Sequence, residues 1–177
     1  MKQGEETMSE SYVELLIKRK PPIWAVIGKA LIIGIIGASI LLTLLGNMIT
    51  FFVAAAFCGI YYLFRGKVDL EYEYLFVGGE LSVDKIIAKD KRKAVINMPI
   101  EKIDMVAPTG SEHLQEYKNK ELKKLDFTSK TGKPSYTVIF NGKEIQYRIL
   151  MELNQEILTM MYNVAPRKIF MENAKNM

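Results

Sequence analysis

The feature that most constrains this chain is a nearly unbroken apolar block at residues 23–65. Its first segment, residues 23–45, carries one charged residue, Lys29, and its second segment, residues 48–64, carries none. The hydrocarbon core of a bilayer needs about 17–25 apolar residues per helix, and both segments reach that length. A short Gly-Asn connection separates them, so the two helices must run in opposite directions. The block therefore predicts a transmembrane helical hairpin.

Basic residues on both flanks of the block predict its orientation. The first segment follows the basic run at residues 18–20, and the second is followed by Arg65 and Lys67, while the connection has no basic residue. Basic residues favour the cytoplasmic side of a membrane. We therefore expect a multi-pass protein of the cell membrane with both termini in the cytoplasm.

Lys29 lies near the start of the first segment, close to Trp24, and Tyr61 and Tyr62 lie near the end of the second. A lysine at that depth can extend its amine to the headgroup layer, where Trp and Tyr also prefer to lie. We interpret these four residues as one interfacial belt. The alternative is an intramembrane charge that serves transport.

Small residues recur every four positions and form one stripe on each predicted helix: Ala30, Gly34 and Ala38 in the first, and Ala55 and Gly59 in the second. Such stripes let helix backbones approach closely in lipid. One interpretation is packing between the two helices of the hairpin, and the other is homodimerisation through the same stripe. We interpret Cys58, the single cysteine, as a small packing residue.

The segment before the block, residues 1–22, is predicted to contain a short amphipathic helix. Ser11 and Glu14 have the spacing of a capping box, and apolar residues follow at helical spacing up to the basic run. A double proline at residues 21–22 would end such a helix. We expect this juxtamembrane helix to lie along the inner leaflet, after a polar and disordered start at residues 1–7.

After the block the apolar pattern changes to a period of two, which is typical of strands. Alternation and turn residues predict seven strands, near residues 70–76, 81–87, 93–98, 103–108, 122–128, 136–140 and 145–149. A polar interruption, which could hold a helical turn or two, separates the fourth strand from the fifth, and a helix closes the region before Pro166. Residues 66–164 should thus form one mostly antiparallel β domain with a C-terminal helix, which makes the fold class α+β. Residues 165–177 are predicted to be a loose basic tail.

Two stretches of this region resemble a known class of domains. They are YEYLFVGGELSVDKI from residue 72 and VINMPIEKIDMVAP from residue 95, the second with an Ile-Pro-x-x-Lys-Ile-like step. With the strand order, they resemble the bacterial pleckstrin-homology-like (PH-like) domains attached to membrane spans, and the chain resembles a family of small Gram-positive membrane proteins of unknown function. The resemblance implies a PH-like fold and an adaptor role. It does not imply phosphoinositide binding, because the hairpin at residues 76–80 has no cation.

Residue types needed for catalysis or metal binding are scarce in this sequence. One histidine, His113, and one cysteine cannot assemble a zinc site, and no glycine-rich loop opens a helix after a strand. Glu71 and Glu73 are spaced like paired acids, but the simpler interpretation is the solvated face of a half-buried strand. We therefore expect no enzyme activity, no cofactor and no metal. The 24 basic and 20 acidic residues are nearly balanced, which argues against nucleic acid as a partner.

Four basic residues gather at one predicted hairpin tip: Lys89, Lys91, Arg92 and Lys93. Near an anionic leaflet each cation contributes about 1 kcal/mol, so the tip could orient the domain against the membrane surface. The other interpretation is a solvated turn that keeps the end of the hairpin polar.

Together these patterns predict a non-enzymatic, membrane-anchored interaction or scaffold module at the cytoplasmic face. Its partners would be the lipid bilayer and a membrane or cytoplasmic protein, with a second copy of the chain as a further alternative. A different class of function is the binding of lipid or a small ligand at the inner leaflet. Resemblance of fold does not decide between these functions.

Overall fold

The computed structural model describes residues 12–171, apart from the side chains at positions 66 and 67. The chain divides into two compact units. One unit holds residues 18–71 and 85–93, and the other holds the remaining described residues, which are 12–17, 72–84 and 94–171. The first unit contains a helical hairpin. The second contains most of the β structure and is here called the β unit.

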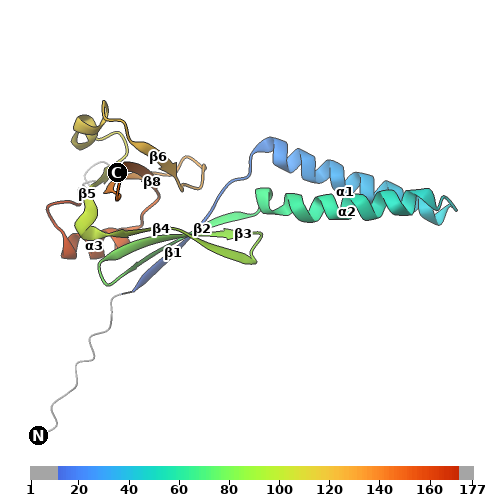
Figure 1. The fold of residues 1–177 in the computed structure, drawn as a ribbon, viewed down its shortest axis with the longest axis horizontal. Coiled ribbons are helices and arrows are strands. Elements are labelled where there is room, and N and C mark those ends of the chain that lie inside the picture. The colour runs from blue at the N-terminus through green and yellow to red at the C-terminus, as the bar shows by residue number, and fades with distance from the viewer. Residues whose placement is uncertain (1–11, 172–177) are drawn as a thin grey trace, which may run out of the picture. The chain divides into compact units, whose positions relative to one another are not determined.

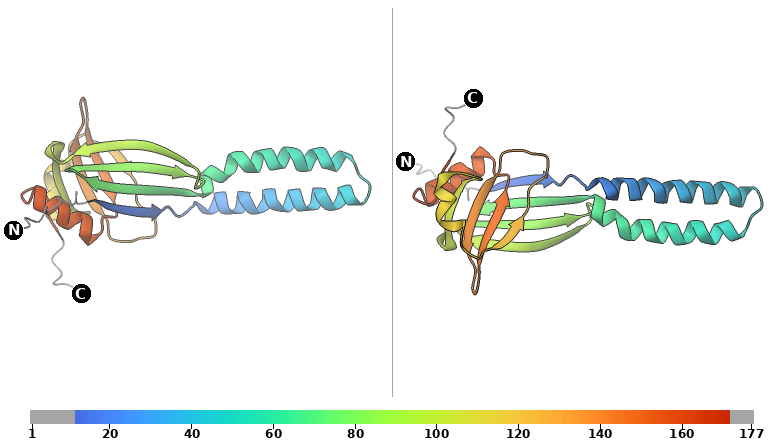
Figure 2. Two further views of the ribbon diagram at one scale, coloured as in Figure 1. Left: turned by 90° about the horizontal axis from the view of Figure 1, so that it is seen from below. Right: turned by 90° about the horizontal axis from the view of Figure 1, so that it is seen from above.

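The first unit is built on two antiparallel helices, α1 (Ile23–Leu44) and α2 (Ile49–Val68), which lie side by side (Figures 1 and 2). Near the closed end, the hydroxyl oxygens of Thr43 and Thr50 lie 2.8 Å apart in a hydrogen bond. Near the open end, the rings of Trp24 and Phe64 meet edge to face. The helical hairpin is therefore confirmed as a fold.

The two helices do not pack through the small-residue stripe. All five of its residues are exposed, and a Cβ added at Gly34 or Gly59 would meet no atom within 4 Å. The covered side of α1 runs through half-buried Ile32 and Ile36 to buried Ser39. A residue two positions further along a helix points about 200° away, so a stripe offset by two faces outward. Packing within the hairpin is thus the wrong interpretation for Ala30, Gly34, Ala38, Ala55 and Gly59, and homodimerisation through them stays a prediction.

The segment before α1 is a strand and not an amphipathic helix. β1 (Val13–Lys18) forms one edge of a four-stranded sheet with the order β1-β2-β3-β4. Val13 and Ile17 are buried while Glu14 and Leu16 are exposed, which follows the period of a strand. The same apolar residues also fit a helical stripe, and pairing with a strand far along the chain decides between the two. Ser11 and residues 1–7 lie outside the described residues.

All seven strands predicted after the hairpin are confirmed. The first sheet continues with β2 (Leu70–Val77), β3 (Glu80–Ile87) and β4 (Lys91–Pro99), which lie side by side in Figure 2. The second sheet has the order β5-β7-β8-β6 and consists of β5 (Ile103–Pro108), β6 (Lys123–Asp126), β7 (Tyr136–Asn141) and β8 (Gln146–Met151). Two short 3-10 helices precede β5 and β6, namely η1 (Ile100–Lys102) and η2 (Glu112–Tyr117). The second of these is the helical turn expected in the polar interruption.

Register in the second sheet sets which side chains share a face. Val138 of β7 lies opposite Ile149 of β8, and both are fully buried. The next pair along the strands is Ile139 opposite Arg148, on the other face of the sheet. β6 pairs with β8 in parallel, so Lys124 also lies opposite Arg148. This parallel pair is the one departure from the antiparallel arrangement in this sheet.

Side chains from both sheets and from α3 (Gln155–Val164) form the core of the second unit. The strands contribute Tyr74, Phe76, Leu81, Val83, Met98, Val106, Val138, Ile149 and Met151. The helix contributes Ile157, Leu158 and Met161, and the Asn154 side chain caps it by accepting the Ile157 backbone N–H at 2.9 Å. The predicted closing helix is confirmed, and so is the α+β fold class.

The chain after α3 packs against β5 and does not form a loose tail. The Val106 backbone N–H donates to the Lys168 carbonyl, and the Val106 carbonyl accepts from Phe170, both at 2.8 Å. The Lys168 amine also donates to two carbonyl groups of η1. The prediction of a loose tail is therefore wrong for residues 165–171, and residues 172–177 lie outside the described part of the chain.

Candidate membrane-facing site

The helical hairpin exposes apolar side chains along its length. Among the described residues, α1 is the one helix long and apolar enough to cross a membrane by length and composition, and 11% of its apolar window is buried. The apolar part of α2, Ile49–Arg65, is shorter. Leu31 of α1 and Phe52 and Leu63 of α2 are well over half exposed. Apolar surface left in water costs about 25 cal/mol per Å², so covering the hairpin with lipid or protein would be favourable.

The open end of the hairpin and the β3–β4 turn belong to the same compact unit. The Ala88 backbone N–H donates to the Asp69 carbonyl at 2.7 Å, and Arg65 Nη2 lies 3.5 Å from Asp90 Oδ2. The β3–β4 turn lies beside the end of α2 because β2 and β3 have equal lengths, so β3 returns the chain to the point where β2 began. That equality is readable in the sequence and could have identified this neighbourhood.

Aromatic and basic side chains gather at the open end. The Arg65 guanidinium lies 4.4 Å from the centre of the Tyr62 ring, and Lys29 Nζ lies 6.0 Å from the centre of the Tyr61 ring. Trp24 packs on Phe64 beside them along the hairpin. Trp, Tyr and basic residues are the types that prefer the lipid–water interface. The predicted belt residues therefore share one end of the hairpin.

The four basic residues of the predicted tip are all exposed, in or beside the β3–β4 turn. Ala88 and Lys89 have φ angles of 52° and 58°, in the left-handed region that tight hairpin turns require. Asp90, the acidic residue within the tip, is the one that meets Arg65. The structure thus brings the basic tip together with the end of α2. Contact of the tip with a membrane surface stays a prediction.

Replacing Lys89, Lys91, Arg92 and Lys93 with glutamine should move the tip away from an anionic membrane. Each cation near such a surface contributes about 1 kcal/mol, so the combined loss is large. The full chain would carry Cys58→Ser and a fluorophore at Val95→Cys, an exposed position just beyond the tip. In vesicles with anionic lipid, headgroup-labelled quencher should quench this fluorophore less in the glutamine variant.

The matched control removes four exposed lysines of the other unit, Lys120, Lys123, Lys133 and Lys143. It should leave quenching unchanged, and purely neutral vesicles should abolish the difference between the variants. Equal quenching of the tip variant and the parent chain would instead identify the tip as a solvated turn.

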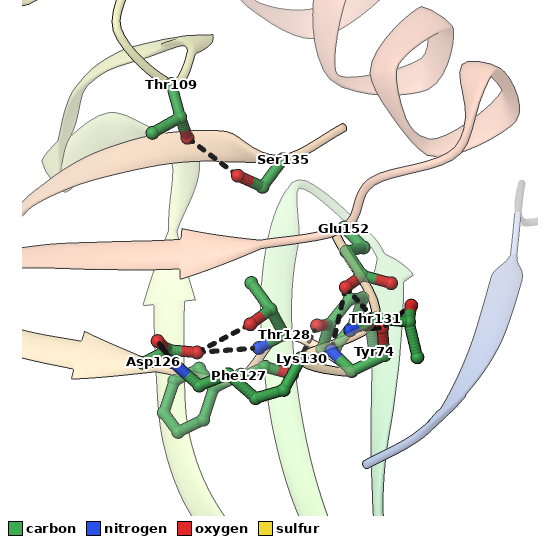
Figure 3. A network of polar contacts seen from close by, with 10 residues as sticks. Tyr74, Thr109, Asp126, Phe127, Thr128, Lys130, Thr131, Ser135 and Glu152 are labelled. Atoms are coloured by element: carbon green, nitrogen blue, oxygen red, sulfur yellow. Dashed lines mark hydrogen bonds and ion pairs between the residues drawn. The ribbon is translucent and has the colours of Figure 1, made fainter. Parts of the chain in front are cut away.

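A polar cluster lies inside the β unit (Figure 3). The buried Glu152 carboxylate accepts the Ser129 backbone N–H at 2.8 Å and the Ser129 hydroxyl at 2.6 Å. The Tyr74 hydroxyl donates to the Phe127 carbonyl at 2.9 Å, and burial raises the pKa of Tyr74 above its usual value. Each contact ties the loop after β6 to another strand or strand end. The cluster is therefore structural, and it fixes the second sheet against β2.

Asp126 closes the start of the same loop. Its carboxylate accepts the backbone N–H and the hydroxyl of Thr128, and it pairs with Lys130 (Figure 3). Burial pushes the pKa of Asp126 upward, but the hydrogen bonds from Lys130 and Thr128 outweigh burial, so the pKa is lowered overall. The carboxylate is thus held in its charged, accepting form.

The structure also places three residues that the sequence analysis named. Glu73 is buried, so the solvated-face interpretation is wrong for it, because β2 is a central strand whose neighbours on both sides help to cover it. Cys58 is exposed on α2. His113 stacks on Phe170 with the ring centres 4.1 Å apart. Within residues 12–171, no group of three or more His, Cys, Asp or Glu could hold a metal ion.

Comparison with known proteins extends the resemblance seen in the sequence. The family model described as bacterial PH-like domain (DUF6106) matches residues 9–171, which is nearly the whole chain and includes the helical hairpin. No match was found among curated proteins or among solved structures. Because the family model covers the hairpin and both sheets together, the likeness extends beyond the two stretches in the β domain. The chain therefore belongs to the bacterial PH-like domain family DUF6106.

Proposed function

We propose that this chain is a non-enzymatic module, anchored in the cell membrane by α1 and α2, that presents its PH-like domain to a protein partner in the cytoplasm. The anchor accounts for the apolar surface of the hairpin. The PH-like domain class is generally non-catalytic, which supports a role in binding. The polar cluster around Glu152 fits this role, because its hydrogen bonds hold the loop after β6 in place.

The observation that carries this proposal is the exposure of the hairpin. A core helix of a soluble protein is mostly buried, whereas 11% of the apolar window of α1 is buried in this chain. The amphipathic residues of the hairpin gather at its open end, where Lys29 lies over the Tyr61 ring and Arg65 over the Tyr62 ring. Tyr, Trp and basic residues at the open end support the proposal, because these types prefer a lipid–water interface.

Protease accessibility tests the anchor and its orientation. The full chain should stay in the membrane pellet after an alkaline carbonate wash. A protease added outside intact cells should leave the β domain uncut, and the same protease should cut it once the cells are opened. Recovery of the chain in the soluble fraction without detergent, or cleavage of the β domain from outside, would contradict the proposal.

In-cell photocrosslinking tests the partner. Tyr162 and Val164 are exposed side chains on α3, which faces away from the core at those positions. A photoreactive residue at either position should capture one defined protein. The same residue at Lys133, in an exposed polar loop, is the matched control and should capture less. Absence of any specific adduct, together with absence of self-association, would count against the module.

A second candidate function, lipid binding at the inner leaflet, is favoured by a hollow at the open end of the hairpin. Its volume is about 170 Å³, and Tyr62, Arg65, Asp90 and Lys91 line it. Opposite charges beside an aromatic ring suit a zwitterionic headgroup. Native mass spectrometry of the purified full chain should then show retained phospholipid, and the variant Arg65→Gln should lose it.

A further inference from the structure

The outer face of the second sheet has a small core of its own. Leu114 and Tyr117 of η2 pack with Ala107 and Ile139, and all four are buried. The polar interruption between the fourth and fifth predicted strands therefore folds back over the sheet and is not simply a solvated loop. A hollow remains at the edge of this covering.

This hollow, here called the basic pocket, has a volume of about 320 Å³. Most of the surface that it exposes is apolar, with Leu114 and Leu150 among the lining residues. The same lining also holds three cations and three hydroxyl groups, namely Lys118, Lys124, Arg148, Thr109, Ser111 and Thr137. None of the described residues that line it is acidic. The volume is near the lower end of sites for small molecules, which begin at roughly 300 Å³.

Arg148 fixes a positive charge at the wall of the basic pocket. Its Nη2 donates to the Tyr117 carbonyl, which anchors the guanidinium to η2. Its Nε is shielded from solvent and has no hydrogen-bond partner, and the Ser111 hydroxyl oxygen is in the same state. Buried polar atoms without partners are costly, so two of them at one pocket point to a group that could satisfy both.

Charge and donor count indicate which group that is. The Thr109 and Thr137 hydroxyls already share a hydrogen bond, so Ser111 is the hydroxyl left to donate. Three cations with this hydroxyl among them match a phosphate group, which carries up to two negative charges and several acceptor oxygens. A carboxylate offers one charge and two oxygens. A larger hollow of about 530 Å³ elsewhere in this unit is lined by Lys102 and Lys143 but also by Glu144, so it does not select an anion.

We propose that the basic pocket binds the phosphate group of a small molecule, with Arg148 and Ser111 as its principal donors and Lys118 and Lys124 as its counter-charges. The phosphate could come from a soluble phosphate ester or from a phospholipid headgroup, and the chemistry of recognition is the same for both. The Ser111 hydroxyl and the Arg148 Nε are both covered from solvent, so the proposal requires these two side chains to shift toward the ligand when it binds. The pocket shares no residue with the basic tip or the helical hairpin, so the proposal does not rest on the proposed anchoring.

Hydrogen–deuterium exchange of the full chain in nanodiscs tests the proposal. In phosphatidylcholine discs, inorganic phosphate added at constant ionic strength should slow exchange in residues 109–118 and 146–150. Discs in which phosphatidic acid replaces part of the lipid should do the same without added phosphate if the source is a headgroup. Protection by added phosphate alone assigns a soluble ligand, and protection by phosphatidic acid alone assigns a lipid. Protection by neither overturns the proposal.

Variants separate the basic pocket from general attraction to charge. Arg148→Gln should lower the affinity for phosphate, read from the protection against exchange, by at least about tenfold. This is the effect expected from losing a hydrogen bond to a charged group. Because Arg148 also holds Tyr117, the exposed Lys124→Gln is the variant without risk to the fold, and it should weaken binding severalfold. Lys143→Gln is the matched control outside the pocket and should bind as the parent chain does. Equal weakening by Lys124→Gln and Lys143→Gln would overturn the proposal.

Discussion

Replacing Ile33 and Ile40 with arginine should release most of the chain from the membrane. Both side chains are about half exposed on α1, at 50% and 51%. An arginine near the centre of a spanning helix costs about 3 kcal/mol relative to isoleucine, which is on the order of a hundredfold in the insertion equilibrium. Ile40 lies nearer the closed end and should add a smaller cost. The measurement is the fraction of chain that stays in the pellet after a carbonate wash.

If the hairpin were instead exposed to water, the same two substitutions should do little harm. There, exchanging exposed isoleucine for arginine changes stability by about 0.5 kcal/mol or less and improves solubility. The matched control is Val95→Arg with Ile145→Arg, two apolar side chains of the β unit with 41% and 46% exposure. The control should leave the pellet fraction unchanged. Equal behaviour of the two double variants would contradict an anchor formed by α1.

Local patterns predicted most of the β domain because its strands follow one another through tight turns. Gly78 and Gly79 both have positive φ, at 58° and 80°, as a two-residue turn requires. The Asn141-Gly142 dipeptide marks the β7–β8 hairpin correctly, but the connection is a four-residue loop, residues 142–145, and not a two-residue turn. Where alternation and turn chemistry agree over consecutive strands, the sequence alone identifies the elements and their order.

Contacts between distant parts of the chain were not predictable in the same way. β1 pairs with a strand that begins after the whole helical hairpin, and its short apolar run fits helix and strand equally well. The parallel pairing of β6 with β8 and the packing of residue 169 on β5 have no local signal either. In each case tertiary pairing overrides a local preference that is weak.

The two candidate sites also differ in whether local sequence reveals them. The basic tip was visible as a run of charge, and its place beside α2 follows from two strands of equal length. The basic pocket was not visible, because Ser111, Lys124 and Arg148 are scattered along the sequence. They meet through the fold of η2 over the sheet and the parallel pairing of β6. A site of this kind can be identified only from the assembled structure.

Glu152→Ala should destabilise the β domain by about 3 kcal/mol. Its carboxylate accepts two hydrogen bonds from Ser129, and the residue is 6% exposed. A hydrogen bond to a charged group contributes about 1.5–3 kcal/mol, and losing the acceptor leaves buried donors unpaired. Part of this loss is offset, because the alanine variant no longer has to remove a carboxylate from water when it folds. The measurement is a urea titration of the full chain in neutral detergent, followed by near-ultraviolet circular dichroism of the tyrosines.

Two companion variants distinguish the lost acceptor from a lost charge or a lost side chain. Glu152→Gln keeps an oxygen that can accept both Ser129 hydrogen bonds and removes the buried charge, so it should cost less than about 1 kcal/mol. Glu144→Ala removes an exposed glutamate from the β7–β8 loop and should change stability by about 0.5 kcal/mol or less. If Glu152→Ala cost no more than Glu144→Ala, the loop after β6 would be held by its packing, with Tyr72 and Phe127 meeting edge to face, and not by the carboxylate.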